Sequence, residues 1–312
     1  MTASNYQKTS FKEYLKEKSF TSKSINRRMV VMEMFWKWLE KENLEAEEVS
    51  YNDLLSYMKY KRVNGASQRT LQNYMGMIKH FYEHLLREGK VSINPASDIE
   101  VKGVKRKMLY HILEPHELQA LYNQYPDDTR STAAPKEIRN KVMLGLLVNQ
   151  GLTTPELSRM EVSDIDLRQG IIDVKGSRRS NGRKMKLESH QVMEMYDYTL
   201  RVRQLIKELP AKRKYQERQE SERLFIGDGG NPPAGGLSNL MTQLMIKVRK
   251  MNPSVLNAQQ IRASVITKWL RMYNLREVQY LAGHKYISST EGYLENEMEG
   301  LKEEIQQYHP MG

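Results

Sequence analysis

The chain has 312 residues, no cysteine and a formal net charge of +11 at pH 7. The lack of cysteine excludes disulfides, thiolate zinc sites and cysteine nucleophiles, and the positive charge favours a polyanionic partner such as nucleic acid. With 39% hydrophobic residues and 18 tyrosines, the composition is that of a folded protein, and the length suggests two domains.

The first residues, MTASNYQKTSFKEYLKEK, are polar and contain no apolar run of the kind found in signal peptides. The longest apolar run in the chain, at 142–148, is far shorter than the roughly 20 residues that span a bilayer. We therefore expect a cytoplasmic protein that does not enter a membrane.

Three helices are predicted in the first 90 residues. Apolar residues recur at steps of three and four from Ser22 and again from Ser67, which is typical of amphipathic helices. The segment between them predicts a shorter helix that ends near Gly65. We expect the three to form a bundle over residues 8–92. The two long stripes are Ile25, Met29, Met32, Trp36 and Leu39, and Leu71, Tyr74, Ile78, Phe81 and Leu85.

Basic residues lie on the other faces of these helices and form either a solvated surface or a DNA-contact surface. His80 and His84 have the spacing of zinc ligands on a helix, but no third ligand is evident, so we expect no metal. The candidate DNA contacts are Lys23, Arg27, Arg28, Arg62, Arg69 and Lys79.

The stretch at 88–115 contains an Asn-Pro pair, two glycines and a basic cluster without periodicity, and residues 93–112 within it are expected to be a basic linker. Two helices are predicted beyond it, at 115–125 and 137–151. A β-hairpin is predicted at 170–188, where β-branched residues precede a turn rich in Gly, Ser and Asn. Helical patterns follow, interrupted by the glycine-rich segment 227–236, which is expected to be an exposed turn. The predicted fold class is mainly α with a small β-sheet.

The stretch YLAGHKYISSTEGYL places His284 nine residues before Tyr293. A capping box predicts that a helix starts at Asn274, and Gly283 is a suitable stop. A second capping box predicts another helix from Ser288. Both side chains can then reach one pocket, provided that the turn between the two helices doubles back.

The segment just upstream, LNAQQIRASVITKWL, predicts a helix that presents Gln259 and Arg262 on one face, three residues apart. Ile261, Val265 and Trp269 are expected to bury the adjoining face. An arginine beside a buried stripe is by default a surface residue, but here His284 and Tyr293 follow closely in the sequence.

These segments resemble the tyrosine recombinases, the family of phage integrases and dimer-resolving recombinases. The resemblance covers nearly the whole chain. It includes LQNYMGMIKHFYEHLLREGKVSINPASDI, IRNKVMLGLLVNQGLTTPELSRMEVSDIDLRQGIIDVKG and IRASVITKWLRMYNLREVQYLAGHKYISSTEGYL. The last is the most specific, because the family separates its Gly-His pair from its nucleophilic tyrosine as Gly283-His284 and Tyr293 are separated here.

The resemblance implies a C-shaped clamp of two domains that cuts and rejoins duplex DNA without cofactor or metal. Residues 8–92 would be a helical core-binding domain and residues 113–312 a catalytic domain that ends in a C-terminal helix. In that family a tyrosine attacks a DNA phosphodiester, which leaves a 3′-phosphotyrosyl link and a free 5′-hydroxyl.

The site residues follow from the same resemblance. Tyr293 would be the nucleophile, Arg262 the second of two arginines that clamp the phosphate, and His284 a donor to a phosphate oxygen. Lys175 is the nearest candidate for the general acid on the hairpin, within two or three residues.

Two positions depart from the family pattern: Thr153 stands where the first arginine belongs, and Gln259 replaces the His of the His-x-x-Arg motif. Each lost donor costs roughly 3 to 4 kcal/mol of transition-state stabilisation. A substitute is expected among the arginines of neighbouring elements, or these arginines are ordinary contacts to the DNA backbone. Arg179 and Arg178 are favoured, ahead of Arg139, Arg159 and Arg183, and Arg183 is also assigned to backbone contact.

The resemblance leaves two functions open. One is a site-specific recombinase or integrase, acting for a mobile element on DNA with paired inverted half-sites. The other is a DNA-binding accessory subunit or regulator that has lost cleavage. A generic RNA-binding or scaffold protein is a third class. The resemblance also implies a homo-tetramer on DNA, joined through a C-terminal segment whose apolar residues are Leu294, Met298, Leu301 and Ile305.

Overall fold

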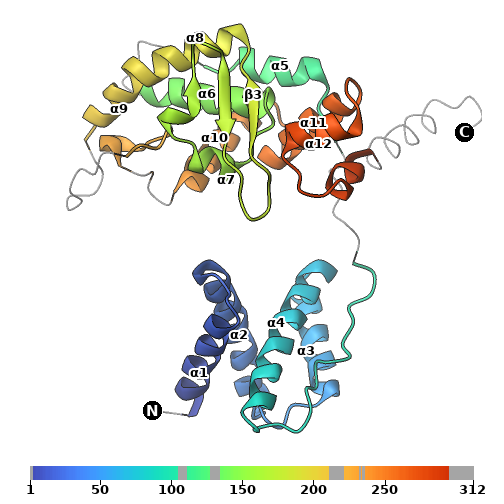
Figure 1. Cartoon of the computed structure of the whole chain (residues 1–312). Coiled ribbons are helices and arrows are strands. Elements are labelled where there is room, and N and C mark those ends of the chain that lie inside the picture. The colour runs from blue at the N-terminus through green and yellow to red at the C-terminus, as the bar shows by residue number, and fades with distance from the viewer. Residues whose placement is uncertain are drawn as a thin grey trace, which may run out of the picture. The chain divides into compact units, whose positions relative to one another are not determined.

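The computed structural model describes residues 3–104, 111–126, 134–210, 221–231, 233 and 236–294, with side chains from residue 7 onward. The chain divides into two compact units, Met1–Lys107 and Met108–Gly312 (Figure 1). Helices predominate and the strands form one three-stranded sheet, so the predicted fold class is confirmed. Within the described ranges no helix has the length and apolar character needed to cross a membrane.

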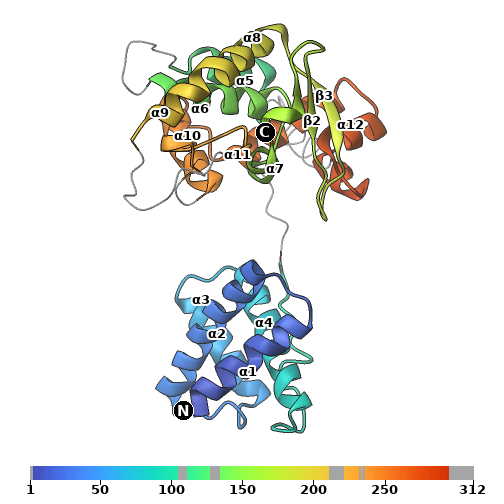
Figure 2. The same cartoon turned by 60° about the vertical axis from the view of Figure 1, so that its left-hand side comes forward.

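The N-terminal unit is a helical bundle (Figure 2). Its helices are α1 (Ala3–Glu17), α2 (Ser22–Glu42), α3 (Tyr51–Val63) and α4 (Gln68–Arg87). The side chains of Thr21, Ser50 and Ser67 cap the N-termini of α2, α3 and α4. The three predicted helices are confirmed. Helix α1 was not predicted, because Phe11, Tyr14 and Leu15 are too few to form a periodic stripe, although all three are buried.

Part of the segment expected as linker packs against this bundle. Ala96 belongs to the bundle core, and Ile99 and Val101 pack on it. The side-chain amide of Asn94 donates to the carbonyl of Lys79, and its oxygen accepts from the N–H of Ala96. The chain therefore stays packed against the bundle from Asn94 to Val101, after α4 has ended.

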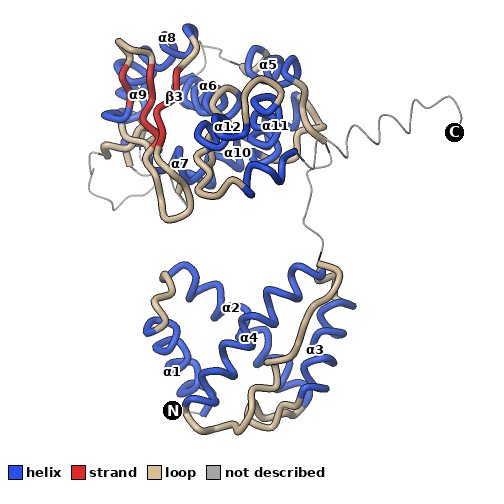
Figure 3. Tube along the Cα trace, turned by 45° about the vertical axis from the view of Figure 1, so that its right-hand side comes forward, coloured by secondary structure: helices blue, strands red, loops and turns tan. Residues whose placement is uncertain are grey.

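The C-terminal unit consists of helices around one small sheet (Figure 3). Its sheet has the order β1 (Ile165–Asp166), β2 (Ile171–Val174) and β3 (Arg183–Lys186), all antiparallel, with Ile172 opposite Met185 and Val174 opposite Arg183. The predicted hairpin is therefore confirmed. The helices are α5 (Pro115–Asn123), α6 (Ala134–Val148), α7 (Thr154–Arg159), α8 (Ser189–Asp197), the π-helical segment η2 (Tyr198–Val202), α9 (Arg203–Glu208), α10 (Leu237–Met251), α11 (Ala258–Leu270) and α12 (Leu275–Ala282).

Helix α6 is central in the core of this unit, as its apolar run predicts. Every residue from 142 to 148 is buried, and α6 contacts α5, α8, α9 and α11. Each large apolar side chain that is buried in this way contributes about 1.5 to 3 kcal/mol. The prediction of an exposed turn at 227–236 was wrong for its first half, because Gly229, Gly230 and Asn231 are buried, and Gly230 approaches the side chain of Lys207 on α9.

Candidate active site

Arg262 lies one turn inside α11 and is almost fully buried, with 8% of its surface exposed. Its Nη1 donates to the carbonyl of Gly151, 2.5 Å away, and its Nη2 donates to the carbonyl of Ala282 at 2.6 Å. Burial, followed by the charge of Arg183, lowers the pKa of Arg262, while Glu156 and Tyr293 oppose this shift. Arg262 therefore joins three segments: α11, the chain that follows α6, and the end of α12.

Gly151 makes the first of these contacts possible. Its φ of +57° is strained for other residues. A Cβ at this position would also lie 3.2 Å from the side chain of Val265 on α11. A glycine is therefore needed for α11 to come close enough for Arg262 to reach this carbonyl.

His284 follows α12, where the prediction from the sequence is confirmed: Asn274 caps the N-terminus in a capping box, and Gly283 ends the helix with a φ of +68°. The Nε2 atom of His284 is 3.4 Å from Nη2 of Arg262, and its Nδ1 is 2.9 Å from the hydroxyl of Thr290. A guanidinium can only donate, so Nε2 accepts and Nδ1 carries the proton.

The imidazole of His284 is held in its neutral form. Burial, and then the charges of Arg262 and Arg183, lower its pKa to about 4, against the weaker opposing effect of Glu156. In this arrangement Nε2 presents a lone pair, so donation to a phosphate from that atom requires the proton to move from Nδ1 to Nε2.

Tyr293 belongs to the helix that was expected here, which begins at Ser288. Its ring is parallel to that of His284, with 5.9 Å between the ring centroids and an interplanar angle of 10°. Tyr293 also interacts electrostatically with the guanidinium of Arg262, whose pKa it raises. The ring is half-buried against the core of the unit. The turn after Gly283 therefore doubles back and brings His284, Tyr293 and Arg262 together.

Thr153, in the place of the family's first arginine, is the N-cap of α7. Its N–H and its hydroxyl both donate to Oε2 of Glu156, at 2.8 and 2.7 Å. Burial raises the pKa of Glu156, but the hydrogen bond and charge of Arg183, then Thr153 and Arg262, outweigh it and lower the pKa overall. Thr153 thus serves the backbone of α7 and orients a buried carboxylate.

Arg183 was assigned to DNA-backbone contact and was named among the possible substitutes for the first arginine. In the structure it is not a surface residue: its side chain is fully buried, and its Nη1 donates to Oε1 of Glu156 at 2.6 Å. In β3, Arg183 and Met185 face inward while Lys184 and Lys186 face solvent. This alternation was available in the sequence, but three basic residues among the four positions of β3 obscured it.

The other proposed substitutes lie elsewhere. Arg139 is a core residue: its guanidinium donates to the carbonyl of Ile226 and to the side chain of Asn140, so it cannot take the role of the missing arginine. Arg178 and Arg179, which were favoured, are exposed in the turn of the hairpin. Their side chains are absent from the described contacts of Arg262 and His284. Arg159 is half-buried at the end of α7.

Lys175 directly follows β2 and is exposed. Its Nζ is 2.7 Å from Glu161 and 2.9 Å from Asp164, and these hydrogen bonds, that of Glu161 first, raise its pKa. Gln259 lies in the first turn of α11, and its side chain is exposed. Both residues therefore face solvent, in contrast to the buried group around Arg262.

Among the basic residues of the N-terminal unit, Lys23, Arg27, Arg62 and Arg69 are exposed. Arg28 is half-buried with its guanidinium 4.1 Å from the ring centroid of Phe20. Lys79 is half-buried and donates to the carbonyl of Ser97. His80 and His84 contact Glu83 and Glu88, respectively.

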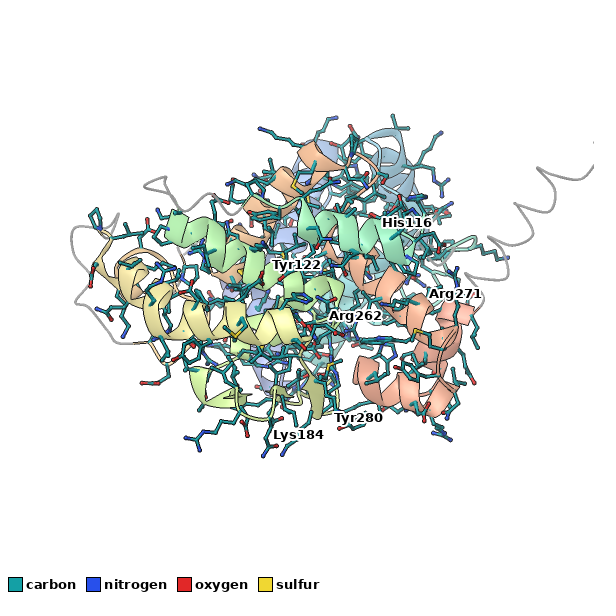
Figure 4. The ribbon with its side chains drawn as sticks, turned by 90° about the horizontal axis from the view of Figure 1, so that it is seen from above. His116, Tyr122, Lys184, Arg262, Arg271 and Tyr280 are labelled. Carbon is teal, nitrogen blue, oxygen red and sulfur yellow. The ribbon has the colours of Figure 1, made fainter. Side chains whose placement is uncertain are left out.

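The β2–β3 hairpin is hydrogen-bonded to α12 and to Gly283, which directly precedes His284. The N–H of Asn181 donates to the carbonyl of Gly283, and the N–H of Lys184 donates to the hydroxyl of Tyr280. Figure 4 shows Lys184 and Tyr280 next to each other and Arg262 farther inside the unit. Of the C-terminal apolar residues, Leu294 is exposed, whereas Met298, Leu301 and Ile305 lie outside the described residues.

Two curated relatives align with nearly the whole chain. Tyrosine recombinase XerC of Bacillus pumilus (strain SAFR-032) is 27% identical over 304 residues, which cover 96% of this chain and 95% of the relative. Tyrosine recombinase XerD of Staphylococcus saprophyticus is 27% identical over 321 residues, which cover 97% of this chain and 99% of the relative.

Solved structures of DNA-bound proteins share the fold. The XerH site-specific recombinase bound to palindromic difH substrate has a TM-score of 0.68 at 18% identity, covering 89% of this chain and 78% of the other. The Tn1549 transposon integrase in complex with circular intermediate DNA has a TM-score of 0.64 at 16% identity, covering 92% and 94%.

Family models match both units. Residues 8–89 match the model described as phage integrase, N-terminal SAM-like domain. Residues 111–299, more than half of the chain, match the model of the phage integrase family. The chain therefore belongs to the phage integrase family, the tyrosine recombinases.

Proposed function

We propose that this protein is a site-specific recombinase that cuts and rejoins duplex DNA through Tyr293 and acts for a mobile element. The observation that carries the proposal is the convergence of three groups. The Tyr293 ring stacks on His284, and His284 contacts the buried guanidinium of Arg262, with which Tyr293 interacts electrostatically. A nucleophile, a proton acceptor and a cation thus lie side by side, which is what attack on a phosphodiester requires.

In the proposed step, the Tyr293 oxygen forms a bond to phosphorus and the bond from phosphorus to the 5′-oxygen breaks. The phenol proton passes to a base, for which neutral His284 is placed. The leaving 5′-oxygen takes a proton from Lys175. The products are a 3′-phosphotyrosyl link and a 5′-hydroxyl, and attack by a 5′-hydroxyl of a partner strand reverses the step. The bond energy is retained, so no cofactor and no metal are needed.

The partners proposed are duplex DNA with paired inverted half-sites and further copies of this chain. XerH and the Tn1549 integrase are DNA-bound proteins, which supports DNA as partner, and the transposon integrase supports a mobile element. We expect four copies on two DNA sites, held together by the segment after Tyr293. Deletion of residues 297–312 should then abolish multimers on DNA in gel-shift experiments while single copies still bind.

The test is a nicked suicide substrate that carries the recombination site of this protein, located by footprinting. We expect an SDS-resistant protein-DNA adduct that is absent with Tyr293→Phe. Tight specific binding without an adduct would instead identify an accessory subunit that has lost cleavage, the reading that Thr153 and Gln259 favour. A footprint without two inverted elements would point to a generic nucleic-acid-binding protein.

A further inference from the structure

We infer that Arg183 replaces the missing first arginine and binds the same phosphate as Arg262, an inference that rests on the proposed function. The first reason is its place. Arg183 starts β3, yet its side chain lies beside the end of α12. A Cβ on Gly283 would clash with Nη1 of Arg183. The charge of Arg183 also lowers the pKa of both His284 and Arg262, so it acts on both residues of the site.

The second reason is that the guanidinium is only partly used. Nη1 donates to Glu156, but Nε and Nη2 of Arg183 are buried and have no hydrogen-bond partner among the described residues. The residue as a whole is 3% exposed. A buried donor without an acceptor is costly, and in a folded protein it calls for an explanation such as a ligand that completes it. A phosphate oxygen is a suitable acceptor, because guanidinium nitrogens bind phosphate oxygens in pairs.

The third reason is the charge balance. Arg183 and Arg262 both contact Glu156, whose two oxygens face one guanidinium each, at 2.6 and 3.9 Å. His284 is neutral in this environment. The described charged groups therefore sum to one surplus positive charge in a nearly dry site, where charges are normally compensated. A phosphodiester carries one negative charge and would balance it.

Thr153 then occupies the position of the family's first arginine, and Arg183 takes over the binding of phosphate. Thr153 caps α7 and orients Glu156, and Glu156 in turn holds Arg183 from the opposite side of the site. The arginine that is missing from the chain after α6 is thus supplied by the hairpin. The proposed cleavage then has a second phosphate-binding arginine although Thr153 stands at the family position. The exposed Arg178 and Arg179 are not needed for it.

The test compares Arg183→Gln with the unaltered protein on two versions of the suicide substrate. One has an ordinary phosphodiester at the scissile position and the other has a methylphosphonate, in which a methyl group replaces a charged oxygen. On the phosphodiester we expect Arg183→Gln to slow adduct formation about 100- to 1000-fold. On the uncharged methylphosphonate the difference should shrink to less than about tenfold, because there is no charge left to neutralise. Arg201→Gln is the control, because Arg201 forms an exposed ion pair with Asp197, and it should resemble the unaltered protein on both substrates.

Binding is measured in parallel, so that the result does not depend on cleavage. The unaltered protein should bind the phosphodiester site at least about tenfold more tightly than the methylphosphonate site, and Arg183→Gln should lose this preference. If the unaltered protein forms no adduct but still prefers the phosphodiester site, and Arg183→Gln loses this preference, the proposed function is rejected and the contact between Arg183 and the phosphate is retained. An equal loss on both substrates, or an unchanged binding preference, would overturn the inference and leave Arg183 a structural residue.

If Arg183→Gln does not fold, as judged by circular dichroism, Arg183→Lys takes its place. Lysine keeps the charge toward Glu156 but lacks the planar fork that binds two oxygens. We expect Arg183→Lys to slow adduct formation less than Arg183→Gln does, and again only on the phosphodiester substrate. The same loss on both substrates would contradict the inference.

Discussion

Glu156 is the residue on which the buried site depends. Its carboxylate accepts from Arg183, from the N–H and hydroxyl of Thr153, and lies 3.9 Å from Arg262. Removing one partner of a buried ion pair leaves the other charge uncompensated, which is far more costly than losing an exposed pair. Both guanidiniums are therefore positioned by one buried carboxylate.

Glu156→Gln should lower the free energy of unfolding by about 3 kcal/mol or more, since two buried cations lose their carboxylate. Urea unfolding measures this. Glu161→Gln is the matched control, because Glu161 pairs with the exposed Lys175, and it should cost less than about 1 kcal/mol. Similar losses for the two variants would contradict the account of Glu156.

The low pKa of His284 predicts a dependence of stability on pH. Its pKa is about 4 in the folded protein and 6.5 in the unfolded chain. Between these pH values the unfolded chain binds more protons than the folded protein. The contribution of His284 to the free energy of unfolding is therefore complete above pH 6.5 and is lost as the pH falls toward 4. The loss amounts to about 3 kcal/mol. Urea unfolding at pH 7.5 and 5 should show a steeper decline for the unaltered protein than for His284→Gln. Parallel declines would show that His284 is protonated in the folded state.

Sequence patterns identified Tyr293, Arg262 and His284 as one site because a fixed spacing carries that information. They named Arg183 only as one of five possible substitutes and favoured two others. Its partner Glu156 lies 27 residues away, and a buried ion pair between distant segments leaves no periodic signal. The expected substitutes Arg178 and Arg179 occupy the most turn-like part of the hairpin, where exposure is the ordinary outcome.

At the level of elements, the contact between the β2–β3 hairpin and α12 assembles the site. The N–H of Asn181 donates to the carbonyl of Gly283, and a bridge pairs Ser180 with His284. Gly283 has two reasons to be glycine, its φ of +68° and the space taken by Arg183. The hairpin thus carries a buried arginine to the helix end that carries the histidine.

Gly283→Ala should separate these two effects when it is compared with Gly89→Ala. Gly89 has a similar φ of +70° and ends α4 with the same hydrogen-bond pattern, but no atom lies within 4 Å of a Cβ added there. Gly89→Ala should therefore cost only the backbone strain of about 1 to 2 kcal/mol. Gly283→Ala should cost more and should also slow adduct formation, because Arg183 is displaced. Thermal unfolding and the suicide substrate measure the two effects, and equal behaviour of the variants would argue against the contact.

The hairpin also carries Lys175, which Glu161 and Asp164 hold in the absence of DNA. If Lys175 protonates the leaving oxygen, Lys175→Met should slow cleavage of an ordinary substrate at least about 100-fold. A substrate with sulfur in place of the bridging 5′-oxygen should restore the rate, because a thiolate leaves without a proton. Equal loss on both substrates would assign proton transfer to another residue.

Periodicity predicted most helices correctly, since α2, α4 and α11 each bury a regular stripe. It missed α1, whose stripe is short, and the burial at Gly229 and Gly230. In both cases packing against other parts of the chain, α2 and α4 for α1 and α9 for the glycines, decides the structure. Such contacts are not encoded in local spacing.

At the scale of the whole molecule, the formal charge of +11 implies binding that depends on salt. Log Kd should change linearly with the logarithm of salt concentration, with a slope near 0.9 for each phosphate contacted. Arg69→Gln, which removes an exposed cation of α4, should reduce the slope by about one. Arg201→Gln is the control, because Arg201 forms an exposed ion pair with Asp197. A slope unchanged in Arg69→Gln would remove that residue from the DNA-contact surface.

The central claim is that the Tyr293 oxygen forms the bond to DNA. The most direct measurement is mass spectrometry of the adduct after digestion with nuclease and trypsin. Cleavage after Lys285 and Lys302 leaves one peptide with two tyrosines, Tyr286 and Tyr293, so the peptide contains its own internal control. Fragmentation should place the nucleotide on Tyr293, whose ring stacks on His284, and none on Tyr286, which is 72% exposed. A nucleotide on Tyr286, or on any other peptide, would contradict the account.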